Sequence, residues 1–168
     1  MGLEEILKGV PPGEYGDLHR SHVLELYRIY VEMADRVSAR RITTNSFFLS
    51  INTAMIGLVG YISVSYKTAL SVDIRLPIAI AGVVICYLWR RIVRSYRDLN
   101  SAKFKVIHAI ELGLPIRPYD SEWEAVGRGR DPKRYLPFTH VEITVPWVFV
   151  ALHVTVMLFA LLAHSPVQ

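Results

Sequence analysis

The chain has 168 residues, 52% of them apolar, with a formal net charge of +4 and a positive mean hydropathy of +0.29. Because 20% of the residues are charged, the charges must be segregated from long apolar runs, a pattern typical of a membrane protein and rare in a soluble one. A single cysteine, Cys86, excludes an internal disulfide and a cysteine-rich metal site.

Residues 1–41 are predicted to form a cytoplasmic tail and an amphipathic helix. The opening MGLEEILKGVPPGEYG lacks the basic and apolar regions of a signal peptide, and Ile6 breaks the myristoylation pattern. From about residue 18, apolar residues recur every three or four positions, at Val23, Leu26, Tyr30, Met33 and Val37. The other face is mixed in charge, so we expect the stripe to contact protein rather than lipid.

Three apolar runs are predicted to cross the membrane, over 42–66, 76–93 and 141–163. A spanning helix needs about 20 apolar residues. The second run has only 14 uncharged residues, Leu76 to Trp89, but Arg90 and Arg91 can extend it by snorkelling. The remaining segments are a loop over 67–75, a long segment over 94–140 that follows the second span, and a tail over 164–168.

The basic residues predict the orientation. Seventeen of the nineteen Lys and Arg residues lie in 1–41 and 90–140, two lie in the loop 67–75, and none follows Ala163. By the positive-inside rule, the N-terminus and 94–140 are cytoplasmic, and the loop and the C-terminus are external. The predicted fold is an all-α integral membrane protein with three transmembrane helices and a cytoplasmic helical bundle.

The second span has no stop signal before Gly113, so its helix is predicted to continue to about Leu112, on the order of 55 Å in all. Its cytoplasmic part carries an apolar face, with Asn100 and Lys103 within it and Glu111 on its edge. Asn100 and Lys103 either make ordinary contacts or specify helix register or subunit partner, as a lone buried Asn does in coiled coils. The predicted bundle or oligomer contacts are Tyr30, Met33, Tyr96, Asn100, Lys103, Phe104, Ile107 and Glu111.

A segment rich in Pro, Gly and charge follows. Ser121 and Glu124 have capping-box spacing, as do Thr139 and Glu142 at the start of the third span. The stretch GRGRDPKR lacks the glycine spacing of a P-loop, so anionic lipid is a better candidate ligand than a nucleotide. The residues predicted to meet anionic lipid or another anionic ligand are Arg90, Arg91, Arg128, Arg130, Lys133 and Arg134.

Polar residues crowd the first span. Small residues share one line of the helix, which lets another helix approach closely: Ser46, Ser50, Thr53, Gly57 and Gly60. Asn45 and Asn52 share a second line, with Asn45 at the membrane interface.

Asn52 lies about 15 Å beyond Ile42, and His153 lies about 18 Å beyond Val141, so the two are expected at similar depth. Polar groups at that depth are costly and often functional. Two alternatives remain: a hydrogen bond that fixes helix packing, or a polar ring around a pore that titration of His153 would gate.

Four stretches together resemble the RipA family of small octameric bacterial membrane proteins: LYRIYVEMADRVSARR, TNSFFLSINTAMIGLVGY, SYRDLNSAKFKVIHAIELGLP and SEWE. The resemblance covers roughly residues 20 to 160. It implies a homo-oligomeric ring of eight subunits in the bacterial cytoplasmic membrane. It supplies no catalytic or ligand-binding residues.

No GxSxG, Cys–His pair or spaced carboxylate cluster is present, so we expect no enzyme activity, no cofactor, no metal and no nucleic-acid partner. Three functions remain open. The first is a membrane scaffold, whose partners are copies of itself and membrane lipids. The second is an ion- or pH-responsive channel lined by the first span, and the third is a sensor that binds an anionic ligand at 117–134.

Overall fold

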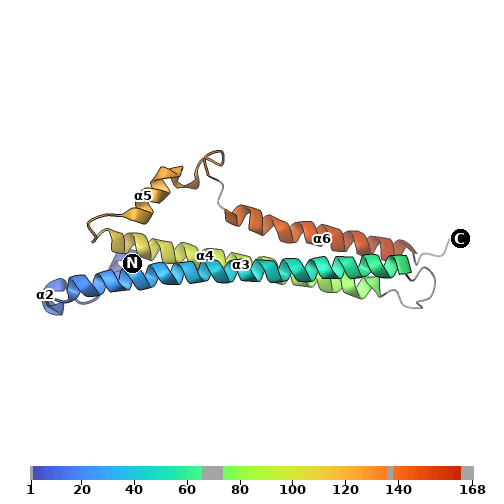
Figure 1. The fold of residues 1–168 in the computed structure, drawn as a ribbon, viewed down its shortest axis with the longest axis horizontal. Helices are drawn as coiled ribbons and strands as arrows, with labels where there is room; N and C mark the ends of the chain where they lie inside the picture. Colours follow the sequence, from blue (N-terminus) through green and yellow to red (C-terminus); the bar gives the residue numbers. More distant parts are fainter. Residues whose placement is uncertain (1, 66–73, 136–137, 164–168) are drawn as a thin grey trace. The chain divides into compact units, whose positions relative to one another are not determined.

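The computed structural model describes residues 2–65, 74–135 and 138–163, and all regular structure within these ranges is helical (Figure 1). Its elements are α1 (Leu3–Leu7), α2 (Pro12–Tyr15), α3 (His19–Ser65), α4 (Arg75–Glu111), α5 (Pro118–Ala125), the 3₁₀ helix η1 (Gly127–Gly129) and α6 (Phe138–Ala163). The predicted all-α class is confirmed. The tail 164–168 and most of the loop 67–75 lie outside the described residues.

Three helices are long and apolar enough to cross a membrane: α3, α4, and residues Val141–Leu162 of α6. The 47-residue α3 runs without interruption from a charged segment into an apolar one, and the 37-residue α4 runs from an apolar segment into a charged one. The prediction that the second helix continues to about residue 112 is therefore correct. The short helices α1, α2 and η1 were not predicted.

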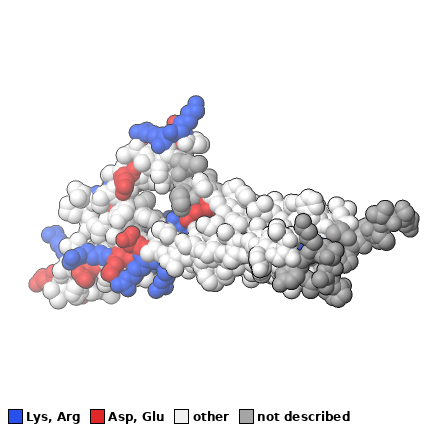
Figure 2. Space-filling view, turned by 45° about the vertical axis from the view of Figure 1, so that its right-hand side comes forward, with Lys and Arg blue, Asp and Glu red and all other residues white. Residues whose placement is uncertain are grey.

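The chain divides into two compact units. A membrane unit comprises Arg41–Ser95 and Phe138–Gln168, and a polar unit comprises Met1–Arg40 and Tyr96–Pro137. Helices α3 and α4 contribute to both. In Figure 2 the coloured charges gather over the polar unit, while the visible surface of the membrane unit is almost uncharged.

In the membrane unit the three long helices meet along a narrow core. Trp89 of α4 is 2% exposed and stacks on Phe48 of α3, with ring centroids 5.8 Å apart and planes 9° apart. Phe149 of α6 reaches the same indole, with centroids 6.1 Å apart. This aromatic layer holds one side chain from each helix. Most other large apolar side chains of the unit are exposed, as expected of helices that meet lipid.

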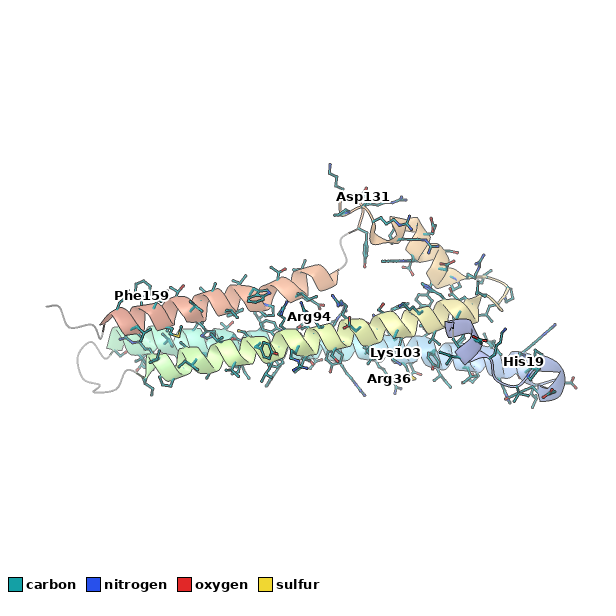
Figure 3. All side chains as sticks on the ribbon, turned by 180° about the vertical axis from the view of Figure 1, so that it is seen from behind. His19, Arg36, Arg94, Lys103, Asp131 and Phe159 are labelled. Carbon is teal, nitrogen blue, oxygen red and sulfur yellow. The ribbon has the colours of Figure 1, made fainter. Side chains whose placement is uncertain are left out.

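In the polar unit, Ala34, Val37 and Ile107 are buried, and the ammonium of Lys103 lies 5.5 Å from the centre of the Tyr30 ring. Figure 3 labels Lys103 on α4. Lys103 therefore covers an aromatic face with its charge, a cation–π contact. Met33, predicted to lie in the stripe, is 43% exposed, because the buried line of α3 is centred nearer to Ala34.

Glu111 ties the end of α4 to the start of α5. Its side chain is fully buried, not at the edge of the face as predicted. Oε1 accepts hydrogen bonds from the Tyr27 hydroxyl at 2.9 Å and the Tyr119 amide at 3.0 Å, and Oε2 accepts one from the Asp120 amide at 3.1 Å. The carboxylate thus satisfies backbone donors that a helix start leaves free, and its negative charge suits that end of the helix.

This arrangement overturns the predicted capping box of Ser121 and Glu124. Helix α5 begins earlier, at Pro118, with Arg117 at the N-cap and no side-chain cap bond, so Ser121 lies inside the helix. Proline at the first helical position has its φ already set for a helix and lacks the amide that would otherwise need a partner. The cap comes from Glu111, a residue outside the local motif.

Candidate functional site

One polar layer of the membrane unit is centred on Asn45 of α3. Its amide nitrogen donates to Glu142 Oε1 of α6 at 2.8 Å, and its amide oxygen accepts from the Trp89 indole of α4 at 2.8 Å. Arg41 Nε lies 3.4 Å from the other oxygen of Glu142. One amide therefore bridges three helices, and its two partners fix which way it points.

Glu142 was expected to cap the third span, and that expectation is wrong. Helix α6 begins at Phe138, and the Glu142 carboxylate, 5% exposed, contacts Asn45 and Arg41. Burying an unpaired carboxylate among apolar helices costs free energy, so Glu142 pairs with an opposite charge and a hydrogen-bond donor rather than with its own helix start. The side chain of Thr139, the other half of the predicted box, lies outside the described residues.

A second polar layer is centred on Asn52. Its amide nitrogen donates to the Phe48 carbonyl at 2.8 Å, and its amide oxygen lies 3.1 Å from both Cys86 Sγ and His153 Nε2. Asn52 and His153 are both 0% exposed. Since the amide oxygen only accepts, we assign the shared proton to Nε2 of a neutral imidazole. Of the two alternatives left open by their similar predicted depth, the structure shows the hydrogen bond between Asn52 and His153.

Gly82 of α4 makes room for the imidazole. A Cβ at this position would lie 2.2 Å from Cε1, 2.3 Å from Nε2 and 2.4 Å from Nδ1 of His153. No side chain fits there unless the ring moves. His153 Nδ1 is buried and has no hydrogen-bond partner in the described part of the chain. The ring therefore packs flat on the α4 backbone and is held through Nε2.

Sequence reasoning missed four members of these layers: Arg41, Gly82, Cys86 and Trp89. A usable signal existed for two of them. An acidic residue within an apolar run needs a cationic partner, which points to Arg41 at the matching end of the first span. An indole N–H also needs an acceptor when buried, which points from Trp89 to Asn45. Nothing in the local sequence marks Gly82 or Cys86.

The small-residue line of α3 faces away from both layers. Its five members are all exposed in the protomer: Ser46, Ser50, Thr53, Gly57 and Gly60. A Cβ added at Gly57 or Gly60 would meet nothing within 4 Å. This line, which we call the small face, therefore packs against neither α4 nor α6 in the described protomer, while the line of Asn45 and Asn52 faces inward.

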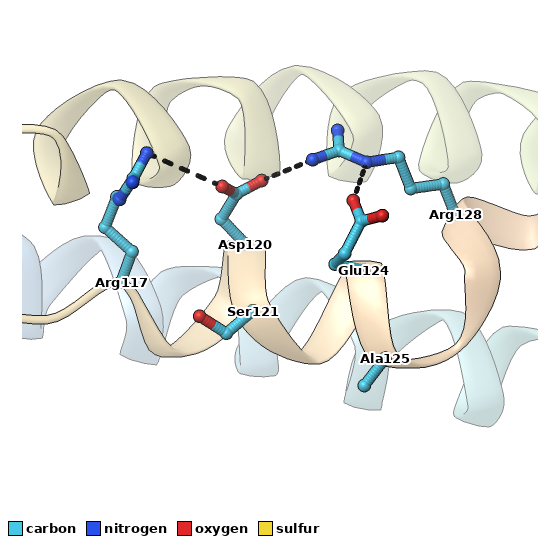
Figure 4. Close-up of a pocket in the computed structure, with 6 residues that line it drawn as sticks. All are labelled: Arg117, Asp120, Ser121, Glu124, Ala125 and Arg128. Carbon is cyan, nitrogen blue, oxygen red and sulfur yellow. Dashed lines mark hydrogen bonds and ion pairs between the residues drawn. The ribbon is translucent and has the colours of Figure 1, made fainter.

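The segment around α5 forms a shallow hollow of about 430 Å³, lined by Arg117, Asp120, Ser121, Glu124, Ala125 and Arg128 (Figure 4). The guanidinium of Arg128 is bonded to Glu124 and lies 3.3 Å from Asp120 Oδ1. The hydrogen bond that Arg128 donates to Glu124, with the charges of both carboxylates, raises the pKa of Arg128. This arginine already has its counter-ions, which makes it a poor anion ligand.

The other predicted basic residues differ from Arg128. Arg130, Lys133 and Arg134 are exposed, and no carboxylate pairs with their side chains among the described residues. Arg90 is half-buried beneath Trp147, and Arg91 is exposed. In the polar unit the Oδ1 atom of Asn100 is buried without a hydrogen-bond partner.

Both layers join helices through hydrogen bonds. In the second layer the Cys86 thiol donates to the same Asn52 oxygen that His153 Nε2 contacts. Within residues 2–65, 74–135 and 138–163, no group of three or more His, Cys, Asp or Glu side chains is placed to hold a metal ion. Hydrogen bonds between membrane helices contribute about 1–2 kcal/mol each in model peptides, so these contacts stabilise the packing of α3, α4 and α6.

Comparison with known families gives a match over residues 24–162 to the model of the octameric membrane protein family, 8xMP. The chain belongs to the 8xMP family. The matched region includes α3 from residue 24 onward, all of α4, residues Val141–Leu162 of α6 and every residue of both polar layers. No curated protein and no solved structure matches the chain. The family name describes an octameric membrane protein, consistent with an oligomeric assembly in a membrane.

Proposed function

We propose that this 8xMP protein is a non-enzymatic scaffold of the bacterial cytoplasmic membrane. In this proposal eight copies assemble as a ring, the polar unit is cytoplasmic, and the C-terminus is external. The family name supports eight copies, and the distribution of basic residues supports the orientation. The more specific RipA assignment stays a prediction.

The observation that carries the proposal is the outward direction of the small face. Each protomer joins its own three helices through inward polar layers and leaves Ser46, Ser50, Thr53, Gly57 and Gly60 uncovered. In lipid, helices associate where small residues let backbones approach and where hydroxyls can bond across the interface. A neighbouring copy of the chain is the partner that the family name supports for this face.

Native mass spectrometry of the detergent-solubilised protein tests the assembly. Wild type is expected to give eight copies. Gly57→Leu places a large side chain on the small face and is expected to release smaller species. Ala151→Leu makes the same kind of change at an exposed position of α6 and serves as the control. If Gly57→Leu keeps the octamer, subunits do not meet at this face, and a monomeric wild type would overturn the proposal as a whole.

A channel is the second candidate, and the structure changes how it must be tested. Asn52 and His153 bond to each other inside one protomer, so they do not line a ring axis in this structure. The exposed hydroxyls of Ser46, Ser50 and Thr53 are polar groups of the first span that face outward, on the small face. Liposome flux with wild type and Ser50→Leu, both as intact oligomers, separates the candidates. Flux that Ser50→Leu abolishes would favour a channel over a scaffold.

A further inference from the structure

Arg90 of α4 lies at one end of the second span, beside an aromatic ring but without a hydrogen-bond acceptor among the described residues. Its guanidinium carbon lies 4.9 Å from the centre of the Trp147 ring of α6, and its Nε atom is buried without a hydrogen-bond partner in the described protomer. A guanidinium stays charged at all physiological pH values and offers five donors in a planar fork. The Trp147 ring contacts the face of the Arg90 guanidinium. The ring offers no acceptor to the N–H groups at the edge of the guanidinium.

Within the described residues, no carboxylate neutralises the charge of this region. Arg91 and Arg94 are exposed and, like Arg90, have no acidic partner among the described residues. Glu142 is the one acidic residue in the described part of the membrane unit, and Asn45 and Arg41 already occupy it. Three positive charges therefore lie within five consecutive residues of one helix.

Such a cluster costs free energy unless an anion joins it. Arg90 and Arg94 are four residues apart, on the same side of α4, where like charges repel. Some arginines elsewhere in the chain are paired, as in Arg36 with Glu32 at 2.6 Å and Arg128 with Asp120 at 3.3 Å. In the described part of the chain the residues of the triplet at 90–94 are not paired in this way, and they lie at the point where the apolar run of α4 ends.

We propose that Arg90, Arg91 and Arg94, with Trp147, bind the phosphate of an anionic phospholipid headgroup. The fork of Arg90 matches the geometry of phosphate oxygens. Trp147 is 52% exposed, and indole rings are favoured at the depth of the headgroups. The neighbouring Val148 is 55% exposed and offers an apolar surface to an acyl chain, which a soluble phosphate would not use. This proposal does not depend on the number of subunits.

The test measures lipid binding to the purified full-length protein by native mass spectrometry and thermal shift. Phosphatidylglycerol is titrated against phosphatidylcholine, with inorganic phosphate in a third arm. Wild type is expected to bind phosphatidylglycerol at least several-fold more tightly than phosphatidylcholine and to melt at a higher temperature with it. Inorganic phosphate is expected to produce no shift.

Arg90→Gln is expected to remove most of that preference. Arg36→Gln removes one equal charge from a paired arginine of the polar unit and is expected to retain it. Arg90→Lys keeps the charge without the planar fork, and its preference for phosphatidylglycerol is expected to lie between those of wild type and Arg90→Gln. If Arg90→Gln fails to fold, the exposed Arg94→Gln replaces it and is expected to reduce the preference. Equal losses in Arg36→Gln and Arg90→Gln, an equal shift with inorganic phosphate, or no preference in wild type would each overturn the proposal.

Discussion

Asn52 and His153 are 101 residues apart in sequence and meet inside one protomer, with Oδ1 and Nε2 3.1 Å apart and both side chains fully buried. The same oxygen also accepts from the Cys86 thiol. Three helices of the membrane unit are therefore joined at a single atom. The structure gives this pair a packing role and turns it away from the outer surface of the protomer.

Asn52→Leu is expected to lower the stability of the membrane unit by about 1–2 kcal/mol, because it leaves the His153 N–H without an acceptor. His153→Leu should cost a similar amount. The double variant Asn52→Leu/His153→Leu should cost less than the sum, since neither partner is then left unpaired. Reversible unfolding in mixed micelles measures the cycle, and strictly additive losses would show that the two residues do not interact.

Gly82→Ala is expected to destabilise the protein, because its Cβ would lie 2.2–2.4 Å from three atoms of the His153 ring. Overpacking of this kind typically costs about 1–3 kcal/mol. Adding His153→Ala to Gly82→Ala should recover part of the loss by removing the ring. Ala151→Leu, a substitution at an exposed position of α6 outside the small face, is the control. Melting temperatures in one detergent compare the four proteins.

Glu111→Gln is expected to loosen the start of α5. Glutamine would keep one acceptor oxygen and present an NH₂ group where a carboxylate oxygen now accepts a backbone amide. Hydrogen bonds to charged groups contribute about 1.5–3 kcal/mol, so hydrogen exchange at the amides of Tyr119 and Asp120 should rise by at least tenfold. The exposed Glu122→Gln is the matched control, and unchanged protection in Glu111→Gln would contradict the capping role.

Tyr27 should make the stability of the polar unit depend on alkaline pH. Burial, with the hydrogen bond to Glu111, raises the pKa of Tyr27 from 10.0 to about 12. The folded state therefore holds the phenol proton more tightly than the unfolded state. The resulting stabilisation is complete below about pH 10 and is lost as the pH rises through about 12.

Tyr27→Phe removes this contribution, so the stability difference between wild type and Tyr27→Phe should be constant up to about pH 10 and shrink toward pH 12. Chemical unfolding at a series of pH values, followed by the fluorescence of Trp123, measures the difference. Tyr135→Phe controls for the loss of an exposed phenol. A difference that grows with pH would mean that the hydroxyl does not stabilise the folded state through Glu111.

The sequence predicted the helical class, the long uninterrupted α4 and the similar depth of Asn52 and His153. These follow from apolar run length, from the absence of Gly and Pro, and from the fixed rise per residue, all of which are local. It did not predict the cap of α5 by Glu111, because a capping box is recognised by spacing, and this carboxylate reaches a helix that starts seven residues later.

The prediction for Glu142 failed for a related reason. Its spacing from Thr139 suggested a cap, whereas its environment depends on which residues of α3 face α6. The sequence also could not predict whether the small face points into the protomer or away from it. A line of Ser, Thr and Gly looks the same whether it meets α4, a second copy or lipid, and only the placement of Asn45 and Asn52 shows which side of α3 is turned inward.

The contact of Gly82 with His153 implies that these two positions evolve together. Any side chain at 82 occupies space that the imidazole fills, so a chain that gains one must first lose or shrink the group at 153. Once the ring is gone, Asn52 keeps only the Cys86 thiol and its own helix as partners, and an apolar residue at 52 becomes easier to accept. Across relatives of this protein, positions 153, 82 and 52 should change as a group, with the change at 153 first.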